Sequence, residues 1–584
     1  MEKTLAKNLR QTFTHYRLRF YKAIVLVLIS NLLLVGNPLV FRHLILSLQN
    51  NPEAYFSDPF SGFFPWIALL LGVALLASLF KYLMRMEFME ISREVEVEVR
   101  AKLFVRIQNQ SREFFDRHGI GELLSRLTSD ITAYRDLLAF GIMYPLFFIT
   151  LVIPGFIALF SISVPLASLS LIPIAIIPLL NWAFRGPIYN TSHAVQASIA
   201  QMSNRVQESY TGIRIVKGYV IEKLMLKRFK EMCCYFTQIS FKLAWLQGIV
   251  FPLFTLVTRM TTLGLVIMSG YIILQELGSL SAADFLSFVW IQSYIFFPIL
   301  MLGWVLPIYQ RGRAAYARLV DIYEEPIQVK DNATSHLQVH PKADIAFHNL
   351  TFSYSEESHP VFSNLNLEIE GGSFVGITGP VGAGKSTLFH LLNRDYEIPH
   401  GTLFIGGHEI HKYSLKALHE AIVIVEQSSF LFSRSLADNV RFGRQEASQE
   451  ELEAAAQFAD LHETIMDFPM QYDTVVGERG VTLSGGQKQR VAMARAFLVD
   501  RSILLLDDIF SAIDTSTERR IFKAISRHFR GKTVLLITHR VSILEQMDRV
   551  LFMSKGKIVE DGTPAELSAK EGHYAALAAL QGKR

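Results

Sequence analysis

The chain has 584 residues, which is too long for one ordinary domain of about 100–200 residues. Hydrophobic residues make up 50% of it and charged residues only 19%, so this is not a disordered protein, which needs low hydrophobicity and high net charge. The net charge of +4 is small for this length and gives no reason to expect nucleic acid as a partner. With only two cysteines, the adjacent Cys233 and Cys234, the chain is not a disulfide scaffold.

Apolar residues are concentrated before about residue 310. Six stretches there are long enough to cross a bilayer as a helix, which takes about 20 apolar residues. The predicted spans are 22–48, 64–88, 137–160, 164–184, 245–273 and 285–308. We therefore expect an all-α six-helix transmembrane domain over residues 1–320, embedded in the lipid bilayer, with no cleaved signal peptide before it.

The distribution of lysine and arginine predicts the orientation of this domain. The connection 49–63 has neither residue, whereas the long connections 91–135 and 186–242 are rich in both. Because basic loops stay on the cytoplasmic side, we expect both long connections and both chain termini in the cytoplasm. The compact layout favours a bacterial inner membrane.

The strongest motif follows a predicted buried strand at 374–378 and precedes a predicted helix at 386–393. Its glycines let backbone N–H groups surround a phosphate, and the helix N-terminus adds positive potential. Lys385 is expected to reach the β- and γ-phosphates, and the Ser386 hydroxyl is expected to be a Mg²⁺ ligand. This phosphate-binding loop consists of Gly379, Pro380, Val381, Gly382, Ala383, Gly384, Lys385, Ser386 and Thr387.

Two further motifs support nucleotide binding. Residues 503–506 read as a central parallel strand that delivers Asp507 to the edge where such sheets bind ligands, and Asp507 is a candidate Mg²⁺ ligand there. Leu483 opens a pentapeptide at the start of a predicted helix, where an anion can bind. Its remaining residues are Ser484, Gly485, Gly486 and Gln487. Together these motifs predict an α/β P-loop nucleotide-binding domain over 344–584, after a linker at 321–343.

With the three motifs in one chain, the sequence resembles the ATP-binding-cassette (ABC) transporters. It is similar to exporter half-transporters, in which six membrane helices are fused to one nucleotide-binding domain. The resemblance implies ATP and Mg²⁺ as cofactors. It also implies a second half-transporter as partner, because each ATP in this family lies between the phosphate loop of one chain and the Leu-Ser-Gly-Gly-Gln segment of the other.

Further residues match the family pattern by position. Tyr354 matches the aromatic residue that stacks on adenine, Gln427 the glutamine that touches Mg²⁺ and senses the membrane domain, and His539 the histidine that senses the γ-phosphate. The segment 511–514 resembles the loop exchanged between the two nucleotide-binding domains. Three other segments, 114–126, 212–217 and 477–480, resemble those through which the two domains of exporters communicate.

The sequence departs from the family pattern at Asp508, where a glutamate usually polarises the attacking water. The shorter side chain withdraws the carboxylate, and a misplacement near 1 Å can cost on the order of 10²-fold in rate. We therefore interpret Asp508 as a weak base in a slow ATP site. This favours a heterodimer, as in the degenerate-site subunit of heterodimeric multidrug-type exporters, and a homodimer with two slow sites is the alternative.

These observations predict a subunit of an ATP-driven exporter for a hydrophobic or amphipathic substrate such as a drug, a lipid or a peptide. The alternatives are a lipid flippase or importer of the same fold, and a nucleotide-gated regulatory subunit that transports nothing. Within the spans, Arg259 is either a structural anchor or a cavity residue, because a charge at that depth is costly. Arg42 is expected to extend towards the interface.

Overall fold

The computed structural model describes residues 14–50, 62–275, 280–332, 335–355, 359–477 and 483–582. The chain divides into two compact units. The first, here called the helical unit, comprises Met1–Ile107 and Gly121–Glu325, and the second, the α/β unit, comprises Gln108–Ile120 and Pro326–Arg584. The predicted boundaries did not anticipate that residues 108–120 are part of the α/β unit.

The helical unit is built from long helices, as its apolar runs predict. Among the described residues, five helical stretches are long and apolar enough to cross a membrane, and Ala282–Phe296 is a shorter apolar stretch. The sixth predicted span, 285–308, begins in this last stretch. It remains helical to its end, but several side chains between residues 297 and 304 are not described. The helices are α2 (Arg17–Asn50), α5 (Phe64–Gln108), α7 (Ile120–Ser125), α8 (Ile131–Ile162), α9 (Val164–Leu169), α10 (Ile172–Thr211), α11 (Ile213–Gly218), α12 (Glu222–Leu274) and α13 (Ala282–Glu324), with a π-helical turn η1 (Arg126–Asp130) before α8.

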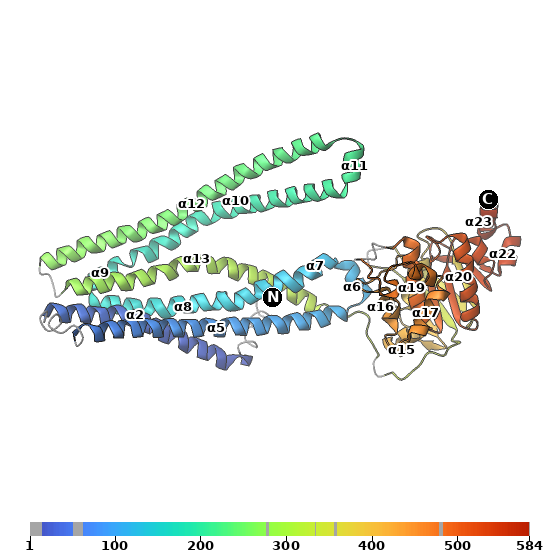
Figure 1. Ribbon diagram of the computed structural model, residues 1–584, viewed down its shortest axis with the longest axis horizontal. Helices are drawn as coiled ribbons and strands as arrows, with labels where there is room; N and C mark the ends of the chain where they lie inside the picture. The colour runs from blue at the N-terminus through green and yellow to red at the C-terminus, as the bar shows by residue number, and fades with distance from the viewer. Residues whose placement is uncertain are drawn as a thin grey trace. The chain divides into compact units, whose positions relative to one another are not determined.

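Helices α10 and α12 pack along each other, and the short α11 joins them at one end (Figure 1). The pair diverges from α8 and α13, which pack closely together. Many large apolar side chains of α10 and α12 are consequently exposed in the single chain, including Trp182, Trp245 and Leu274. These surfaces are available to lipid or to another chain.

Polar contacts between distant helices fix the register of the bundle. Arg42 of α2 forms an ion pair with Asp284 of α13. Arg42 was expected to extend towards the membrane surface, and in the structure its charge is instead paired with this carboxylate. The buried Asn31 donates to the Thr150 hydroxyl at 2.7 Å. Arg259 lies exposed on α12, with no hydrogen bond or ion pair to any described residue.

The α/β unit contains two sheets. An antiparallel sheet has the order β2-β1-β4-β5, and a six-stranded sheet has the order β10-β9-β3-β8-β7-β6. Its strands are β1 (Ile345–Phe352), β2 (Phe362–Ile369), β3 (Phe374–Thr378), β4 (Leu403–Ile405), β5 (His408–Glu409), β6 (Ile422–Val425), β7 (Ile503–Asp507), β8 (Thr533–Ile537), β9 (Arg549–Ser554) and β10 (Lys557–Gly562).

Helices cover the sheets on several sides and form two hydrophobic cores with them. They are α6 (Arg112–Arg117), α14 (Lys385–Leu392), α15 (Leu415–Ala421), α16 (Leu436–Val440), α17 (Gln449–Phe458), α18 (His462–Met466), α19 (Gly485–Val499), α20 (Thr515–His528), α21 (Val541–Leu544), α22 (Pro564–Ala569) and α23 (His573–Gly582). The mixed α/β architecture agrees with the predicted fold class.

The strands β3, β8, β7 and β6 are adjacent and parallel. Their apolar composition follows from this position, since a parallel strand is buried on both faces. In β8 all five residues are buried, and in β7 the first four are. The carboxyl ends of all four strands therefore lie at one edge of the sheet.

Candidate functional site

The carboxyl edge of the parallel strands gathers most of the predicted site residues. β3 leads into the phosphate loop, β8 ends two residues before His539, β7 ends at Asp507, and β6 ends two residues before Gln427. Ligands of open α/β sheets bind at this edge. Four loops that are far apart in sequence thus meet at one place because their strands are neighbours.

The phosphate loop needs glycine at defined positions. Gly379 has φ +140° and a side chain there would lie 1.9 Å from the Met553 carbonyl oxygen. Gly384, with φ +94°, precedes α14, and a side chain there would meet the ring of Phe362 at 2.8 Å. Only glycine accepts these positive φ values without strain. The loop therefore presents backbone amides at the start of α14, where an anion is stabilised.

Lys385 is folded over this loop. Its Nζ donates to the carbonyl oxygens of Gly379 and Pro380, both at 2.8 Å. Burial lowers the pKa of Lys385, partly offset by the carboxylates of Asp507 and Asp508. A buried ammonium group that has only carbonyl oxygens as acceptors is a ready partner for an anion. The adjacent Ser386 is exposed.

Asp508 is held in an uncommon conformation next to Asp507. Its φ is +44°, a region that aspartate tolerates better than most residues, and its N–H donates to the Ile537 carbonyl at 2.9 Å. The Gln427 amide Nε2 donates to Asp508 Oδ2 at 3.1 Å. Burial raises the pKa of Asp508 above its usual value, and the Asp507 carboxylate adds to this rise.

His539 faces the same group of charges. Burial and the nearby Lys385 lower the pKa of His539, so the imidazole is neutral over a wider range of pH. Its backbone is fixed by a residue near the end of the chain: Gln581 Nε2 donates to the His539 carbonyl at 2.6 Å, and Gln581 Oε1 accepts from Val541 N–H at 3.0 Å. Nothing in the sequence pointed to Gln581, because it lies in no motif.

The predicted anion site at residues 483–487 forms the N-terminus of α19. Ser484 caps the helix: its hydroxyl accepts from Gln487 N–H at 3.2 Å, and Gln487 Oε1 accepts from Ser484 N–H at 2.8 Å. Within the described ranges, no hydrogen bond joins this segment to the phosphate loop. Gln489, two residues further along the helix, donates to the Gln427 carbonyl at 3.3 Å and to the Ser511 hydroxyl at 3.1 Å. Gln489 lies just outside the pentapeptide motif and belongs to no other motif.

Asp514, which ends the predicted exchange loop, caps α20. Its carboxylate accepts from Ser516 N–H at 3.1 Å and from Thr517 N–H at 3.0 Å. These hydrogen bonds, together with that of the Ser516 hydroxyl, hold the pKa of Asp514 well below its usual value. The segment 478–480, which the sequence assigned to communication between the domains, lies outside the described residues.

Tyr354 lies beside the phosphate loop. Its hydroxyl forms a hydrogen bond of 2.7 Å with Thr387 Oγ1, and its ring packs edge-on against Tyr396, with 5.1 Å between the ring centroids. The side chain is 39% exposed, which leaves part of the ring open to solvent. Tyr396 also contacts α6, because its hydroxyl donates to the Asp116 carboxylate.

The short helix α6, within the segment predicted to communicate, packs on this site. Arg112 Nη1 donates to Glu426 Oε1 at 2.7 Å, and Arg112 N–H donates to the Asp395 carbonyl at 3.3 Å. Phe114 is buried, with only 1% of its surface exposed. Glu426 directly precedes Gln427, whose side chain contacts Asp508, so two residues connect α6 to Asp508. The second predicted segment, 212–217, coincides with α11 of the helical unit.

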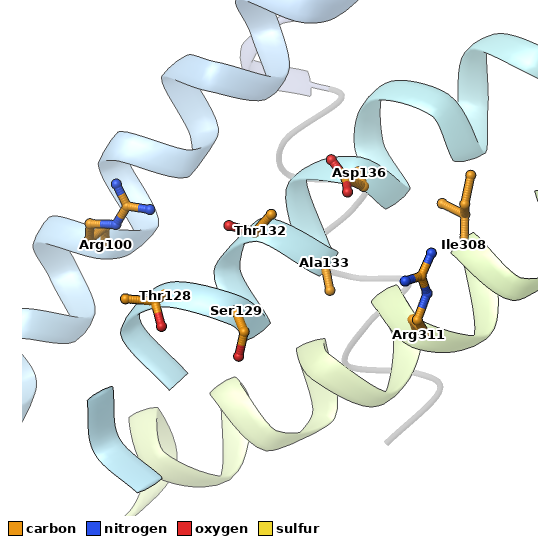
Figure 2. Close-up of a pocket in the computed structure, with 8 residues that line it drawn as sticks. All are labelled: Arg100, Thr128, Ser129, Thr132, Ala133, Asp136, Ile308 and Arg311. Carbon is orange, nitrogen blue, oxygen red and sulfur yellow. The ribbon is translucent and has the colours of Figure 1, made fainter. Parts of the chain in front are cut away.

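The helical unit contains a cavity of about 440 Å³ with charged residues in its lining, which comes from three helices (Figure 2). Its charged residues are Arg100, Asp136 and Arg311. It lies beyond the predicted second span, among residues predicted to be cytoplasmic, and includes none of the nucleotide-site residues. The remaining lining residues are Thr128, Ser129, Thr132, Ala133 and Ile308.

Comparison with known families matches both parts of the chain. Residues 20–299 match the family described as "ABC transporter transmembrane region", and residues 362–511 match the family described as "ABC transporter". The two matches follow one another in a single chain, as the sequence predicted.

Several relatives match nearly the whole chain. The protein named "Uncharacterized ABC transporter ATP-binding protein YknU" of Bacillus subtilis (strain 168) is 31% identical over 98% of this chain and 97% of its own length. "Multidrug resistance-like ATP-binding protein MdlA" of Escherichia coli (strain K12) is 30% identical over 87% and 86%. "ATP-dependent lipid A-core flippase" of Chromohalobacter salexigens is 32% identical over 84% of each chain.

A solved structure agrees with this relationship. The "Structure of a bacterial Atm1-family ABC exporter with ATP bound" superposes with a TM-score of 0.79 at 25% sequence identity, covering 97% of this chain and 98% of that one. The similarity therefore includes both the membrane part and the nucleotide-binding part.

Proposed function

Because the chain belongs to the ATP-binding-cassette transporter family, as an exporter half-transporter with an ATPase domain, we propose that it carries the slow ATP site of a heterodimeric exporter. The observation that carries this proposal is the aspartate at position 508, where the family usually has glutamate. Its carboxylate is short and already engaged by Gln427 at 3.1 Å.

ATP binding rests on the phosphate loop and its surroundings. The ammonium group of Lys385 would exchange its two carbonyl acceptors for phosphate oxygens, and the amides at the start of α14 would hold the β-phosphate. The partly open ring of Tyr354 would stack on adenine, while His539, neutral and fixed by Gln581, would donate to the γ-phosphate.

The residues at the edge fit a magnesium ion. The exposed Ser386 hydroxyl, the Asp507 carboxylate and the Gln427 amide oxygen are hard oxygen donors of the kind that Mg²⁺ prefers. The contact of Gln427 with Asp508 uses its Nε2, which leaves Oε1 as a donor to metal. When bound, Mg²⁺ neutralises charge on the β- and γ-phosphates.

A second subunit is needed to complete the site. Ser484 and the first-turn amides of α19 form an anion site that, among the described residues, has no hydrogen bond to the phosphate loop of its own chain. We propose that Ser484, Gly485, Gly486 and Gln487 close over the ATP of a partner that has glutamate at the position of Asp508. The present chain would thus hold one ATP firmly and complete the faster site of its partner.

Helix α6 provides the link to the membrane helices. Arg112 reaches Glu426, whose neighbour Gln427 contacts Asp508, and Asp116 reaches Tyr396, which packs against Tyr354. Two independent contacts thus lead from α6 to the base and to the adenine side of the site. A movement of these residues on ATP binding would displace α6 and the helices to which it is joined.

We propose that the substrate is hydrophobic or amphipathic and is exported from the cytoplasm across a bacterial inner membrane. Both chain termini are then in the cytoplasm. Its spans are strongly apolar, and the charged cavity with Arg100, Asp136 and Arg311 offers polar contacts at the cytoplasmic side. Arg259 on α12, which has no ion pair with any residue that the structure describes, is proposed to face the substrate cavity, because a charge without a partner is costly in lipid.

The experiment is a comparison of two preparations in lipid vesicles: this chain expressed alone, and the complex purified through a tag on this chain from its natural membrane. We expect slow hydrolysis by the chain alone and faster, substrate-stimulated hydrolysis by the complex, with a second half-transporter present. Brisk turnover by a homodimer would refute the heterodimer. ATP-dependent substrate movement distinguishes a transporter from a regulatory subunit, the alternative to which Asp508 gives some weight.

A further inference from the structure

A cluster of two histidines and two glutamates lies at the edge of the antiparallel sheet, apart from the nucleotide site. Glu397 follows α14, His400 precedes β4, Glu409 is in β5, and His411 is in the 3₁₀ turn after it (Ile410–Lys412). The two imidazole rings lie close together, with 4.1 Å between their centroids and an angle of 34° between their planes.

Glu409 orients both rings through one nitrogen each. Its Oε1 lies 2.9 Å from His400 Nδ1 and 3.2 Å from His411 Nδ1, and it also accepts from Gly401 N–H at 2.8 Å. With Nδ1 of each ring facing Glu409, Nε2 of each ring is the nitrogen left to face a ligand. A histidine oriented by a carboxylate in this way is the arrangement seen at metal centres.

The second nitrogen of His411, Nε2, is buried and has no hydrogen-bond partner among the described residues. The side chain is 10% exposed, and Nε2 forms no hydrogen bond although Glu397 Oε1 lies 3.3 Å away. The second oxygen of Glu397 also has no hydrogen bond, and Arg394 Nη2 lies 3.7 Å from it. Buried polar atoms without partners are rare and require an explanation. A cation between His411 Nε2 and Glu397 Oε1 supplies one.

We propose that Glu397, His400 and His411 bind a transition-metal ion of the zinc type, with Glu409 orienting the two histidines. One ligand atom from each of the three residues lies within 4.8 Å of the others. Two imidazole nitrogens and one carboxylate oxygen are ligands that Zn²⁺ accepts at about 2.0–2.2 Å, with a fourth position open to water. His400, whose side chain is 76% exposed, provides the entry from solvent.

The site is placed where it can stiffen the segment that leads from α13 into β1. Asn332 of that segment donates to the carbonyl oxygens of His411 at 3.5 Å and Lys412 at 3.4 Å, and the Ser335 hydroxyl donates to Lys412 at 2.5 Å. A metal ion on His411 would thus fix the turn to which this segment is hydrogen-bonded. This role is independent of Mg²⁺ and ATP.

Cobalt is the probe that tests the proposal, because Co²⁺ with nitrogen ligands in a tetrahedral or five-coordinate site absorbs strongly in the visible. Full-length protein, freed of any histidine tag and of nucleotide, is titrated with Co²⁺ alone and then with Zn²⁺. We expect one strongly absorbing Co²⁺ per chain, displaced by Zn²⁺. His411→Ala should weaken this binding by at least about tenfold.

Two control variants keep the test decisive. His408→Ala removes an exposed histidine of the same strand that is not a ligand, and Ser386→Ala alters the proposed magnesium site; both should bind Co²⁺ as the unaltered protein does. His400→Gln changes an exposed side chain, so it should fold and still lose the strong absorption. The proposal is overturned if no saturable absorption develops, or if the His411→Ala and His400→Gln variants retain it.

Discussion

The substitution Asp508→Glu is the most direct test of the slow site, because it restores the side-chain length that the family usually has. One added methylene extends the carboxylate by about 1.5 Å. In the structure, Asp508 Oδ2 is bound to Gln427 Nε2 at 3.1 Å, so the present carboxylate is held back at the sheet edge. Since a misplacement near 1 Å can cost on the order of 10²-fold, the longer side chain should raise hydrolysis at this site by up to that factor, or about 2.7 kcal/mol in activation free energy.

The assay is phosphate release by the complex in lipid vesicles, with ATP saturating. Asp508→Asn is the matched control, because it keeps the shape and tolerates the φ of +44° while removing the base. We expect Asp508→Glu to be faster than the unaltered protein and Asp508→Asn to be slower or equal. If Asp508→Glu is no faster although it binds ATP and melts at the same temperature, side-chain length does not limit the reaction, and the explanation of the slow site is wrong.

The pH profile of the same site follows from the raised pKa of Asp508. Only the ionised carboxylate accepts a proton from water, and a raised pKa means that protonation begins at a higher pH as the solution is acidified. Hydrolysis should therefore fall on acidification sooner than it would for an ordinary aspartate. In Asp508→Asn this acidic limb should be absent, and an unchanged profile would assign it to another group.

Three further substitutions test other parts of the site. Lys385→Ala should abolish ATP binding, measured with a fluorescent ATP analogue, because it removes the ammonium group of the phosphate loop; retained binding would contradict its role. Arg112→Ala breaks a half-exposed ion pair with Glu426, so the melting temperature should change little while substrate stimulation of hydrolysis is lost. Preserved stimulation would exclude this contact from coupling. Gln581→Ala should slow hydrolysis several-fold without changing ATP affinity, because it releases the His539 backbone; an unchanged rate would show that this hydrogen bond is dispensable.

Short-range patterns made the core of the site predictable. The spacing of Gly379 and Gly384 specifies a loop that other residues cannot form, and the apolar run 503–506 specifies a buried strand before Asp507. Local periodicity therefore predicted where the functional loops begin. Family resemblance then supplied Gln427 and His539, and the adjacency of the strands brings these residues together.

Contacts between residues distant in sequence were not predictable. Arg112 and Glu426 are 314 positions apart, and Arg42 and Asp284 are 242 apart, so no local pattern relates them. Gln581 belongs to no motif and gains its importance only because α23 packs beside α21. Such pairs form only through tertiary packing, and a short stretch of sequence does not show which distant residues will come into contact.

The chain passes between its two units three times, after Ile107, after Ile120 and after Glu325. A domain joined by one flexible linker could rotate without disturbing the helices. Three connections oppose such independent rotation of the α/β unit. A rearrangement of the α/β unit must pull simultaneously on the end of α5, on the start of α7 and on the end of α13. Inserting flexible residues at one crossing would uncouple only that connection and leave the other two intact. Coupling between the two units should therefore be lost in steps as more crossings are lengthened.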